Sequence, residues 1–373
     1  MFAYRPKSAH FAVLIFLFLS WSIFGINAQA SGLGALFKDY QAALAEADSD
    51  AIMEKASAVY EYARQNLPQD SKSRAAATLN YSKALFAARK FQAADDLSEE
   101  ALERFIASYG DVAQELLDPY LERARTVAGN LGASSGHRQT HRHYLRKALK
   151  IAEQLQGKDS QLFAIISLEA GRIALDNAGS NTAFRYLEDA HEAFSGPYKD
   201  STIYRFQANF YMGKYLMARK KYRTAQPYFE EALAVADTEG APDSKLEMTV
   251  RAFLVDIYES VGESEKSIAQ CRAIGKMVPF NMDQEPQSLF RRMPTYPAAA
   301  LQSRREGYAV VSFTISDSGI PTDIETVETE GSDSFGVAAE DYIRGLRYAP
   351  RFENGEPVDT PDRKFKVSFS LAK

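Results

Sequence analysis

GYAVVSFTISDSG, residues 307–319, decides the fold of the last part of the chain. Apolar and polar residues alternate from Val311 to Ile315, which is the period of a strand that is buried on one face. Asp317-Ser318-Gly319 then predicts a turn, and a second extended run begins at Ile320. Alternation interrupted by a glycine-containing turn predicts a β-hairpin.

Two further elements follow this hairpin. Apolar residues recur at helical spacing from Phe335 to Leu346, which predicts a helix entered through 332–334 and ended before Pro350. From Lys364 to Leu371 apolar and polar residues alternate again, which predicts a half-buried final strand. One helix and three strands predict a small two-layer α+β domain.

Several short motifs in this region occur together in a fixed order. They are YPAAA at 296–300, EGYAVVSF at 306–313, DSG at 317–319, LRYAP at 346–350 and NG at 354–355. In this order they resemble the C-terminal domain of the TonB family, and the resemblance covers residues 293–373. Leu346 stands where that family usually carries a tryptophan, which we interpret as a change in packing.

The resemblance implies a binding site on the last strand. In the TonB family this sheet receives a short segment from the N-terminal end of an outer-membrane transporter, by addition of a strand. The residues implied in that role are Lys364, Phe365, Lys366, Val367, Ser368 and Phe369, with Tyr296 and Pro297 beside them. The two lysines favour an acidic segment, or they protect an exposed sheet edge against aggregation.

The first thirty residues have the pattern of an export signal. Arg5 and Lys7 precede an apolar run over 11–26, and Ala28-Gln29-Ala30 offers small residues where a signal peptidase cleaves. The alternative is an uncleaved inner-membrane anchor, because no charged residue lies between Lys7 and Lys38. Either pattern predicts a body in the periplasm. TonB-type transducers contact a proton-driven motor through such an anchor and carry a proline-rich spacer, which this chain lacks.

Residues 31–279 are dominated by helix-forming residues and contain an internal repeat. Gly129, Gly171 and Gly213 are 42 residues apart, and three further sets of positions keep the same step. Those sets are Tyr144, Tyr186 and Tyr228; Leu145, Leu187 and Phe229; and Ala148, Ala190 and Ala232. A further unit places Val255 where the others have glycine and Cys271 where they have Leu187 or Phe229, and an earlier, off-register unit contains Phe91.

Each repeat predicts two helices. The glycine of the first helix permits close approach of a neighbouring helix, and the second helix carries the aromatic or leucine and the alanine on one face. The segment 220–233 resembles the second helix of a tetratricopeptide repeat (TPR), although the step exceeds the usual length of about 34. Stacked helical hairpins form a solenoid that binds a peptide or a helix. Residues 280–292 are the expected linker to the C-terminal domain.

Composition excludes several classes of function. The net charge is −5, so the chain lacks the overall basic character of nucleic-acid-binding proteins. Cys271 is the only cysteine, which excludes an intramolecular disulfide and zinc sites built from cysteine pairs. We find no nucleophile elbow, no P-loop and no dinucleotide-binding glycine motif, and expect neither an enzyme nor a cofactor.

Three features remain as candidates for metal binding or catalysis. His137, His141 and His143 have helical metal-ligand spacing, but basic residues surround them, so a basic face for an acidic partner or anionic lipid headgroups is favoured. The acidic run at 95–100 predicts a solvated helix face. Cys271 falls at a repeat core position and predicts a small buried residue, with no histidine placed to activate it.

Together these observations predict a TPR-like solenoid followed by a TonB-type domain. The function expected is that of a periplasmic TonB-family protein that binds an outer-membrane transporter or envelope partner through its terminal sheet and takes part in TonB-dependent transport. The alternative is a soluble periplasmic scaffold without energy transduction.

Overall fold

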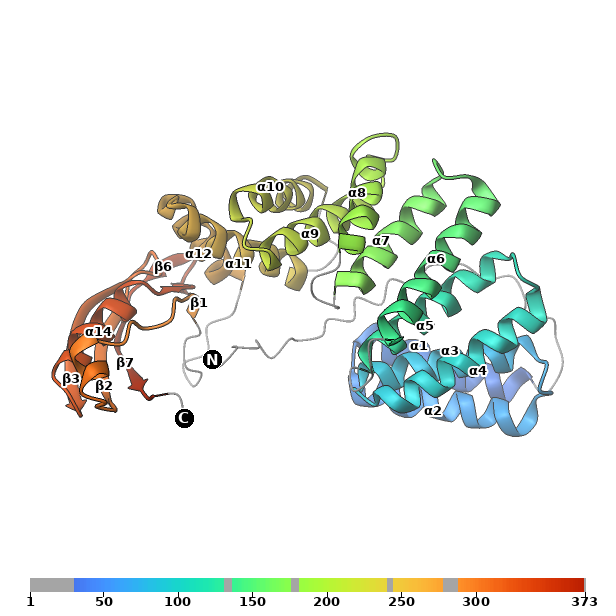
Figure 1. Ribbon diagram of the computed structural model, residues 1–373, viewed down its shortest axis with the longest axis horizontal. Helices are drawn as coiled ribbons and strands as arrows, with labels where there is room; N and C mark the ends of the chain where they lie inside the picture. Colours follow the sequence, from blue (N-terminus) through green and yellow to red (C-terminus); the bar gives the residue numbers. More distant parts are fainter. Residues whose placement is uncertain (1–29, 131–135, 176–180, 240–243, 278–287, 372–373) are drawn as a thin grey trace. The chain divides into compact units, whose positions relative to one another are not determined.

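The computed structural model describes residues 30–130, 136–175, 181–239, 244–277 and 288–371. These residues form two compact units, 30–199 and 200–371. The first unit contains helical hairpins, and the second contains two more hairpins together with the C-terminal sheet domain (Figure 1). The expected leader lies almost entirely outside the described residues, as does most of the expected linker.

The first unit is built from four consecutive helical hairpins. Their helices are α1 (Ala30–Glu46), α2 (Ser49–Asn66), α3 (Lys72–Ala87), α4 (Phe91–Tyr109), α5 (Leu117–Gly129), α6 (Gly136–Gln156), α7 (Gln161–Leu175) and α8 (Asn181–Ser195), with a short 3₁₀ turn at Gln114–Leu116. Local sequence sets their ends. The Asp48 carboxylate accepts the backbone N–H groups of Asp50 and Ala51 at the start of α2, and Gly110 ends α4 with a φ of 77°.

The second unit begins with two further hairpins. Their helices are α9 (Thr202–Ala218), α10 (Tyr222–Glu239), α11 (Ser244–Val261) and α12 (Ser264–Met277). In both units the two helices of a hairpin pack against each other, and so do successive hairpins within a unit, such as α2 against α3 and α10 against α11. This is the stacking that the sequence repeat predicts.

The repeated glycines mark the close contacts inside the hairpins. A Cβ at Gly171 would lie 2.6 Å from Leu187, and one at Gly213 would lie 2.7 Å from Phe229. In the last hairpin a larger residue, Val255, replaces the glycine, and a smaller one, Cys271, replaces the leucine or phenylalanine. Both residues are fully buried. The hairpin core therefore keeps its volume while its residues change.

The first repeated glycine differs in its partner. A Cβ at Gly129 would lie 2.4 Å from Phe86 and 3.2 Å from Phe91, which belong to the preceding hairpin. Leu145, at the position matching Leu187, is nevertheless fully buried. The close contact at Gly129 therefore lies between two hairpins, whereas the contacts at Gly171 and Gly213 lie within one hairpin.

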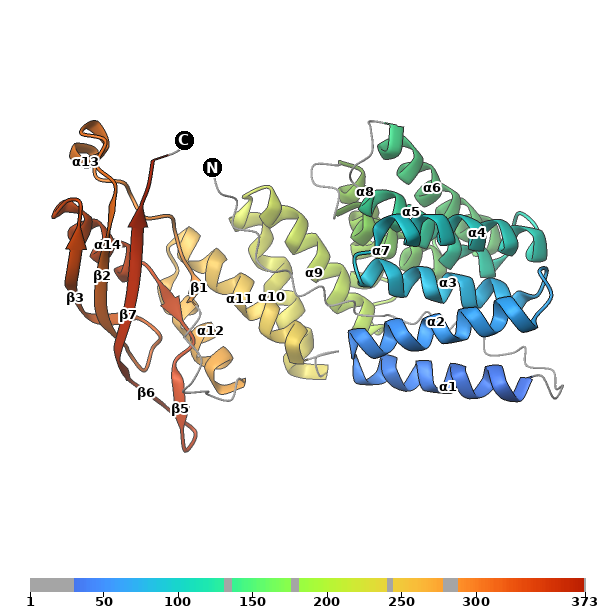
Figure 2. The same ribbon diagram turned by 90° about the horizontal axis from the view of Figure 1, so that it is seen from below.

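The C-terminal domain contains a three-stranded antiparallel sheet covered on one face by a helix. The strands lie in the order β3 (Pro321–Glu330), β2 (Gly307–Ile315), β7 (Thr360–Phe369), and α14 (Ser334–Arg344) packs on β2 and β3 (Figure 2). The predicted hairpin, helix and final strand are thus confirmed. The final strand begins four residues earlier than the alternation indicates.

The sheet and α14 enclose one hydrophobic core. From β2 it takes the residues that the alternation assigns to the inner face, and Leu346 fills it at the end of α14. Its buried members are Ala300, Ala309, Val311, Phe313, Ile315, Phe335, Ala339, Ile343, Leu346, Tyr348, Val367 and Phe369.

Four short strands and one short helix were not predicted. Strand β1 (Ser288–Phe290) pairs with β4 (Arg347–Tyr348), and β5 (Arg351–Glu353) pairs with β6 (Glu356–Val358). The short helix α13 (Ala298–Gln302) precedes β2. Strand β1 lies within the expected linker at 280–292, so the last part of that linker belongs to the folded structure.

The last helical hairpin packs directly on the C-terminal domain. Helix α11 contacts β1, and α12 contacts β4, β5 and β6. Val255, Cys271 and Ile274 of the hairpin share a buried cluster with Phe290 of β1. A Cβ at Gly275 would lie 2.4 Å from the carbonyl oxygen of Pro350, so this glycine is required for the close approach.

Candidate functional site: the β7 edge of the C-terminal sheet

Strand β7 lies at one edge of the three-stranded sheet. It pairs with β2 from Gly307↔Phe369 to Ile315↔Thr360, and no strand among the described residues pairs with its other side. Pro361, near its start, cannot donate a backbone hydrogen bond and is a residue that sheets tolerate at an edge. The outer side of β7 therefore presents backbone groups to which an extended peptide can bind.

The six predicted residues of β7 divide between the two faces of the sheet. Val367 and Phe369 are buried in the core, and Phe365 is half-buried against it. Lys364, Lys366 and Ser368 are exposed on the opposite face. A peptide paired to β7 would therefore meet two ammonium groups on the face that α14 does not cover.

The opposite sheet edge carries the opposite charge. Strand β3 has exposed Glu325, Glu328 and Glu330, and the register aligns Glu328 and Lys366 with the same β2 residue, Val310. Carboxylates on β3 repel an acidic segment, whereas the lysines on β7 attract one. The charge distribution thus distinguishes the two edges.

Tyr308 connects the two charged edges across β2. The Lys366 ammonium lies 3.3 Å from the centroid of the Tyr308 ring, and the Tyr308 hydroxyl donates a hydrogen bond to Glu328. This hydrogen bond to a carboxylate raises the pKa of Tyr308 to about 12. This role of Tyr308 does not follow from the sequence, because it depends on the register across three strands.

Tyr296 packs against the end of β7, as the resemblance implied. Its ring lies edge-on to Phe369 at 5.6 Å and to Phe335 at 5.8 Å, and its hydroxyl donates to the carbonyl of Arg305. Pro297 follows it as the residue before α13. The fold therefore brings Tyr296 together with β7, with most of its contacts directed into the domain core.

Two apolar side chains near Tyr296 in the sequence are exposed. Met293 is 84% exposed and Leu301 is 50% exposed, and they flank the Tyr296 segment in sequence. Single exposed apolar residues are common on protein surfaces, so these two do not by themselves mark a docking site.

The histidine cluster is divided by the structure. His141 is buried, and its Nδ1–H donates to the carbonyl of Ala124 at 2.9 Å. Burial lowers the pKa of His141, partly offset by that hydrogen bond. His143 is exposed, and the side chain of His137 lies outside the described residues. The residues that are described contain no group of three or more potential metal ligands.

Cys271 is buried, as its repeat position predicts. Burial raises the pKa of its thiol to about 12, and a protonated thiol is a poor nucleophile. The acidic run behaves less uniformly than predicted. Asp96 and Glu99 are exposed, but the Asp95 carboxylate is largely buried against the Arg123 guanidinium, so this part of the prediction is wrong.

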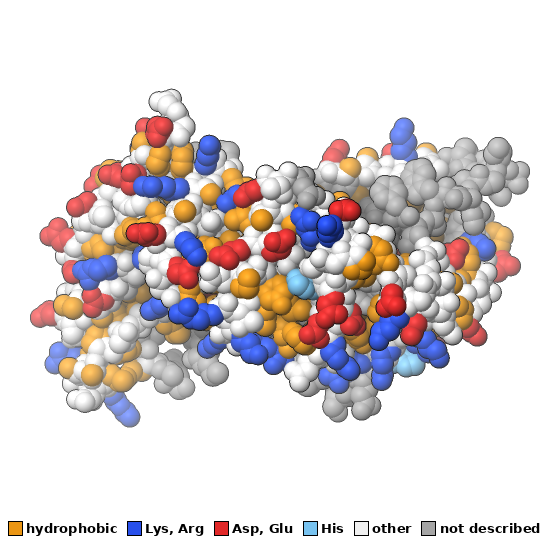
Figure 3. All heavy atoms as spheres, turned by 90° about the horizontal axis from the view of Figure 1, so that it is seen from above, with side chains coloured by type: hydrophobic (Ala, Val, Ile, Leu, Met, Phe, Trp, Pro, Cys, Tyr) orange, Lys and Arg blue, Asp and Glu red, His pale blue; other side chains and the backbone are white. Residues whose placement is uncertain are grey.

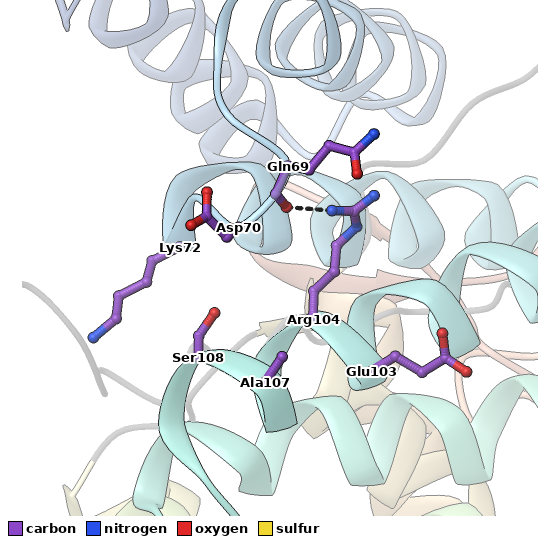
Figure 4. Close-up of a pocket in the computed structure, with 7 residues that line it drawn as sticks. All are labelled: Gln69, Asp70, Lys72, Glu103, Arg104, Ala107 and Ser108. Carbon is purple, nitrogen blue, oxygen red and sulfur yellow. Dashed lines mark hydrogen bonds between the residues drawn. The ribbon is translucent and has the colours of Figure 1, made fainter.

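A shallow cavity of about 510 Å³ lies at the start of α3 and the end of α4 (Figure 4). The Arg104 guanidinium donates to the carbonyl of Gln69 at its centre, and Lys72 lies over the ring of Tyr109 at 4.1 Å. Its other lining residues are Asp70, Glu103, Ala107 and Ser108. The cavity is thus open to solvent and lined by charges of both signs.

A set of ion pairs that the sequence did not predict lies along the first helices of the hairpins. Helix α3 contacts α5, and α5 contacts α7, so these first helices lie next to one another. The ion pairs are Lys83–Asp118 at 2.5 Å, Arg125–Glu122 at 2.7 Å and Arg172–Glu169 at 2.6 Å. Glu122 is fully buried, and its second oxygen has no hydrogen-bond partner among the described residues.

The C-terminal domain is similar to a known protein family. Residues 292–371 match the family model described as the Gram-negative bacterial TonB protein C-terminal. This match begins one residue before the boundary expected from the sequence motifs. The matched residues comprise α13, β2, β3, α14, β4, β5, β6 and β7. No curated protein matches the chain.

Several solved structures are similar to this chain. TPR-like repeats of a protein from Podosopora anserina described as a kinesin light chain share 17% identity, with a TM-score of 0.46 over 58% of this chain and 100% of that one. BtubC (BKLC) from P. vanneervenii shares 18% identity, with a TM-score of 0.46 over 72% and 100%. A thermophilic TPR protein of Thermus thermophilus shares 19% identity, with a TM-score of 0.33 over 56% and 94%.

The helices of the described residues also differ from membrane spans in their hydropathy. None of them is both long and apolar enough to cross a bilayer.

Proposed function

We propose that this is a periplasmic TonB-family protein that binds the N-terminal segment of an outer-membrane transporter at β7. The observation that carries the proposal is the open outer edge of β7 in a domain that matches the TonB C-terminal family. Strand addition would extend the sheet by one strand, with backbone hydrogen bonds supplying affinity. Lys364 and Lys366 would select acidic segments, and Tyr296 would hold the end of β7 in place.

The first test measures binding of synthetic peptides copied from the N-terminal segments of the organism's own outer-membrane transporters. Reversal of two charges, Lys364→Glu with Lys366→Glu, should weaken binding of acidic peptides by about tenfold or more. A control pair on the other edge, Asp323→Asn with Glu325→Gln, removes two exposed charges and should leave binding unchanged. Equal effects of both pairs would show that the peptide does not select β7.

The second test addresses the backbone. Val367→Pro removes an N–H group and places a proline inside β7, which should abolish binding of every peptide, whatever its charge. Because Val367 is also buried, the melting of the domain is recorded in parallel. Undiminished binding by a folded Val367→Pro protein would rule out strand addition.

Participation in energy-dependent transport requires a link to the inner membrane. The N-terminus of the protein recovered from envelope fractions distinguishes the two arrangements. A chain that begins at Ser31 has lost its leader and with it any direct route to the proton-driven motor. An intact chain in the inner membrane supports transduction, with the motor as a further partner.

The second candidate function is a soluble periplasmic scaffold, in which the helical hairpins bind one partner and the TonB-type domain another. The ion pairs along α3, α5 and α7 favour it, because they place four partly exposed charged side chains, Lys83, Asp118, Arg125 and Arg172, on neighbouring helices. A peptide or helix bound there would exchange some of these pairs for its own. Recovery of the same envelope partner by the wild type but not by Lys83→Glu would support this function.

A further inference from the structure

The second helix of the third hairpin differs from the rest of the molecule in charge. Between Arg123 and Ala152 the chain contains no Asp or Glu, although the whole protein carries a net charge of −5. Helix α6 occupies most of this stretch, and its one acidic residue, Glu153, lies one residue beyond it. By contrast, α4 of the preceding hairpin contains five acidic residues and one arginine. We call the exposed cations of α6, Arg142, Arg146, Lys147 and Lys150, the α6 basic face.

Helical geometry places these cations together. Arg142, Arg146 and Lys150 are spaced by four residues and so form a row along three turns, with Lys147 beside it. All four side chains are exposed, as is that of His143. The opposite side of the helix, represented by His141, Leu145 and Ala148, is buried in the hairpin core. The basic row therefore points outward from the first unit.

The α6 basic face lacks internal neutralisation. No carboxylate of the described residues forms an ion pair with any of its four cations. Other arginines of the same unit are paired, for example Arg104 with Glu100, Arg123 with Asp95 and Arg172 with Glu169. A row of unpaired like charges raises the electrostatic energy of the protein, and a surface of opposite charge would relieve it.

Helix α8 adds one more cation to this surface. Burial raises the pKa of Tyr186 on α8, whereas Arg146, Arg185 and Arg142 each lower it, so three guanidinium groups lie within electrostatic range of one phenol. The surface ends on α8 one turn further on, at Glu188 and Asp189. In the space-filling view, Lys and Arg side chains lie beside a histidine at the lower right, with Asp and Glu side chains next to them (Figure 3).

We propose that the α6 basic face docks this protein on an anionic lipid surface. Protein interfaces are anchored mostly by Trp, Tyr or Arg in desolvated pockets, and lysine is depleted there, whereas two of these four cations are lysines and all four are exposed. The exposed positions from Arg142 to Lys150 include no apolar side chain. Lipid phosphates require none, since each lysine or arginine near an anionic surface contributes independently to attraction.

The test compares vesicles of two compositions. The full chain is used as cells produce it. If the protein retains its leader, it is first placed in neutral phosphatidylcholine nanodiscs, which keep it in solution. Co-sedimentation with phosphatidylcholine vesicles containing about 30% phosphatidylglycerol should exceed that with pure phosphatidylcholine vesicles by at least about tenfold at low salt. Raising the salt to about 0.5 M should remove the difference, because exposed charges are then screened.

A quadruple variant identifies the surface responsible. Replacing the four cations by glutamine (Arg142→Gln, Arg146→Gln, Lys147→Gln, Lys150→Gln) should reduce binding to anionic vesicles by about tenfold or more. A control of equal charge change in the second unit replaces four other exposed cations: Lys220→Gln, Lys221→Gln, Arg223→Gln and Lys276→Gln. The control should bind as the wild type does.

Three results would overturn the proposal. The first is equal binding to neutral and anionic vesicles, and the second is an equal loss in the quadruple variant and its control. The third comes from a parallel titration with a polyglutamate peptide. If the peptide binds the wild type and not the quadruple variant, while anionic vesicles bind neither, then the surface serves an acidic polypeptide instead of a membrane.

Discussion

Glu259 and Arg347 form a buried ion pair between the last helical hairpin and the TonB-type domain. The Arg347 Nε lies 2.8 Å from the Glu259 Oε1, and the two side chains keep only 13% and 7% of their surface exposed. Glu259 lies near the end of α11, and Arg347 begins β4. Because a buried charge is costly without its partner, this pair makes the hairpin and the domain depend on each other.

Removal of one partner should destabilise the second unit strongly. Glu259→Gln or Arg347→Met leaves an uncompensated buried charge, and we expect a loss of about 3–5 kcal/mol in the free energy of unfolding. Denaturant unfolding of the full chain measures it. The exposed pair Arg344–Asp341 supplies the control, since Arg344→Gln should cost at most about 1 kcal/mol. Similar losses in both would contradict the coupling.

The repeated glycines should be intolerant of a single methyl group. Gly171→Ala places a Cβ 2.6 Å from Leu187 and 3.2 Å from its backbone nitrogen, and we expect a loss of about 1–3 kcal/mol. Gly34→Ala is the matched control in the same unit, because nothing lies within 4 Å of the added atom. That variant should gain about 0.5–1 kcal/mol from better helix propensity. Thermal melting should show a lower melting temperature for Gly171→Ala and a higher one for Gly34→Ala.

Stability of the first unit should depend on the protonation of Glu122. Burial raises the pKa of this carboxyl above its ordinary value of 4.5, although Arg125 and Lys83 oppose the shift. The folded protein therefore holds the proton more tightly than the unfolded chain does. The resulting stability is present below pH 4.5 and is lost as the pH rises through the raised pKa.

The corresponding variant is Glu122→Gln, which cannot ionise. Its stability relative to the wild type should grow as the pH rises above about 4.5, and the difference should vanish below that pH. Unfolding curves over a pH series provide the measurement. Glu54→Gln, at a side chain that is 73% exposed, should follow the wild type throughout. A difference that is independent of pH would contradict this assignment of the burial cost.

The ring of Tyr296 should contribute more to the free energy of unfolding than its hydroxyl group does. Tyr296→Phe loses only the hydrogen bond to Arg305 and should cost about 1 kcal/mol. Tyr296→Ala also loses the edge-on contacts with Phe335 and Phe369 and should cost about 3 kcal/mol or more. If peptide binding falls in Tyr296→Phe while the melting temperature is unchanged, the hydroxyl contacts the partner directly.

Sequence alone determined the parts of this protein that depend on periodicity. The alternation at 307–315, the helical stripe from Phe335 and the glycines at steps of 42 each report local geometry, because a strand repeats every two residues and a helix every 3.6. Motif order also predicted the TonB-type domain, which the family match at 292–371 confirms. These signals need no knowledge of distant contacts.

Only the tertiary structure decided what lies between these parts. Strands β1 and β4 hold three and two residues, too few to show a period, and they form because segments far apart in the chain pair. The Glu259–Arg347 ion pair and the contact between Tyr308, Lys366 and Glu328 likewise join distant segments. Their existence depends on packing geometry, which emerges only when hairpin, sheet and helix are placed in three dimensions.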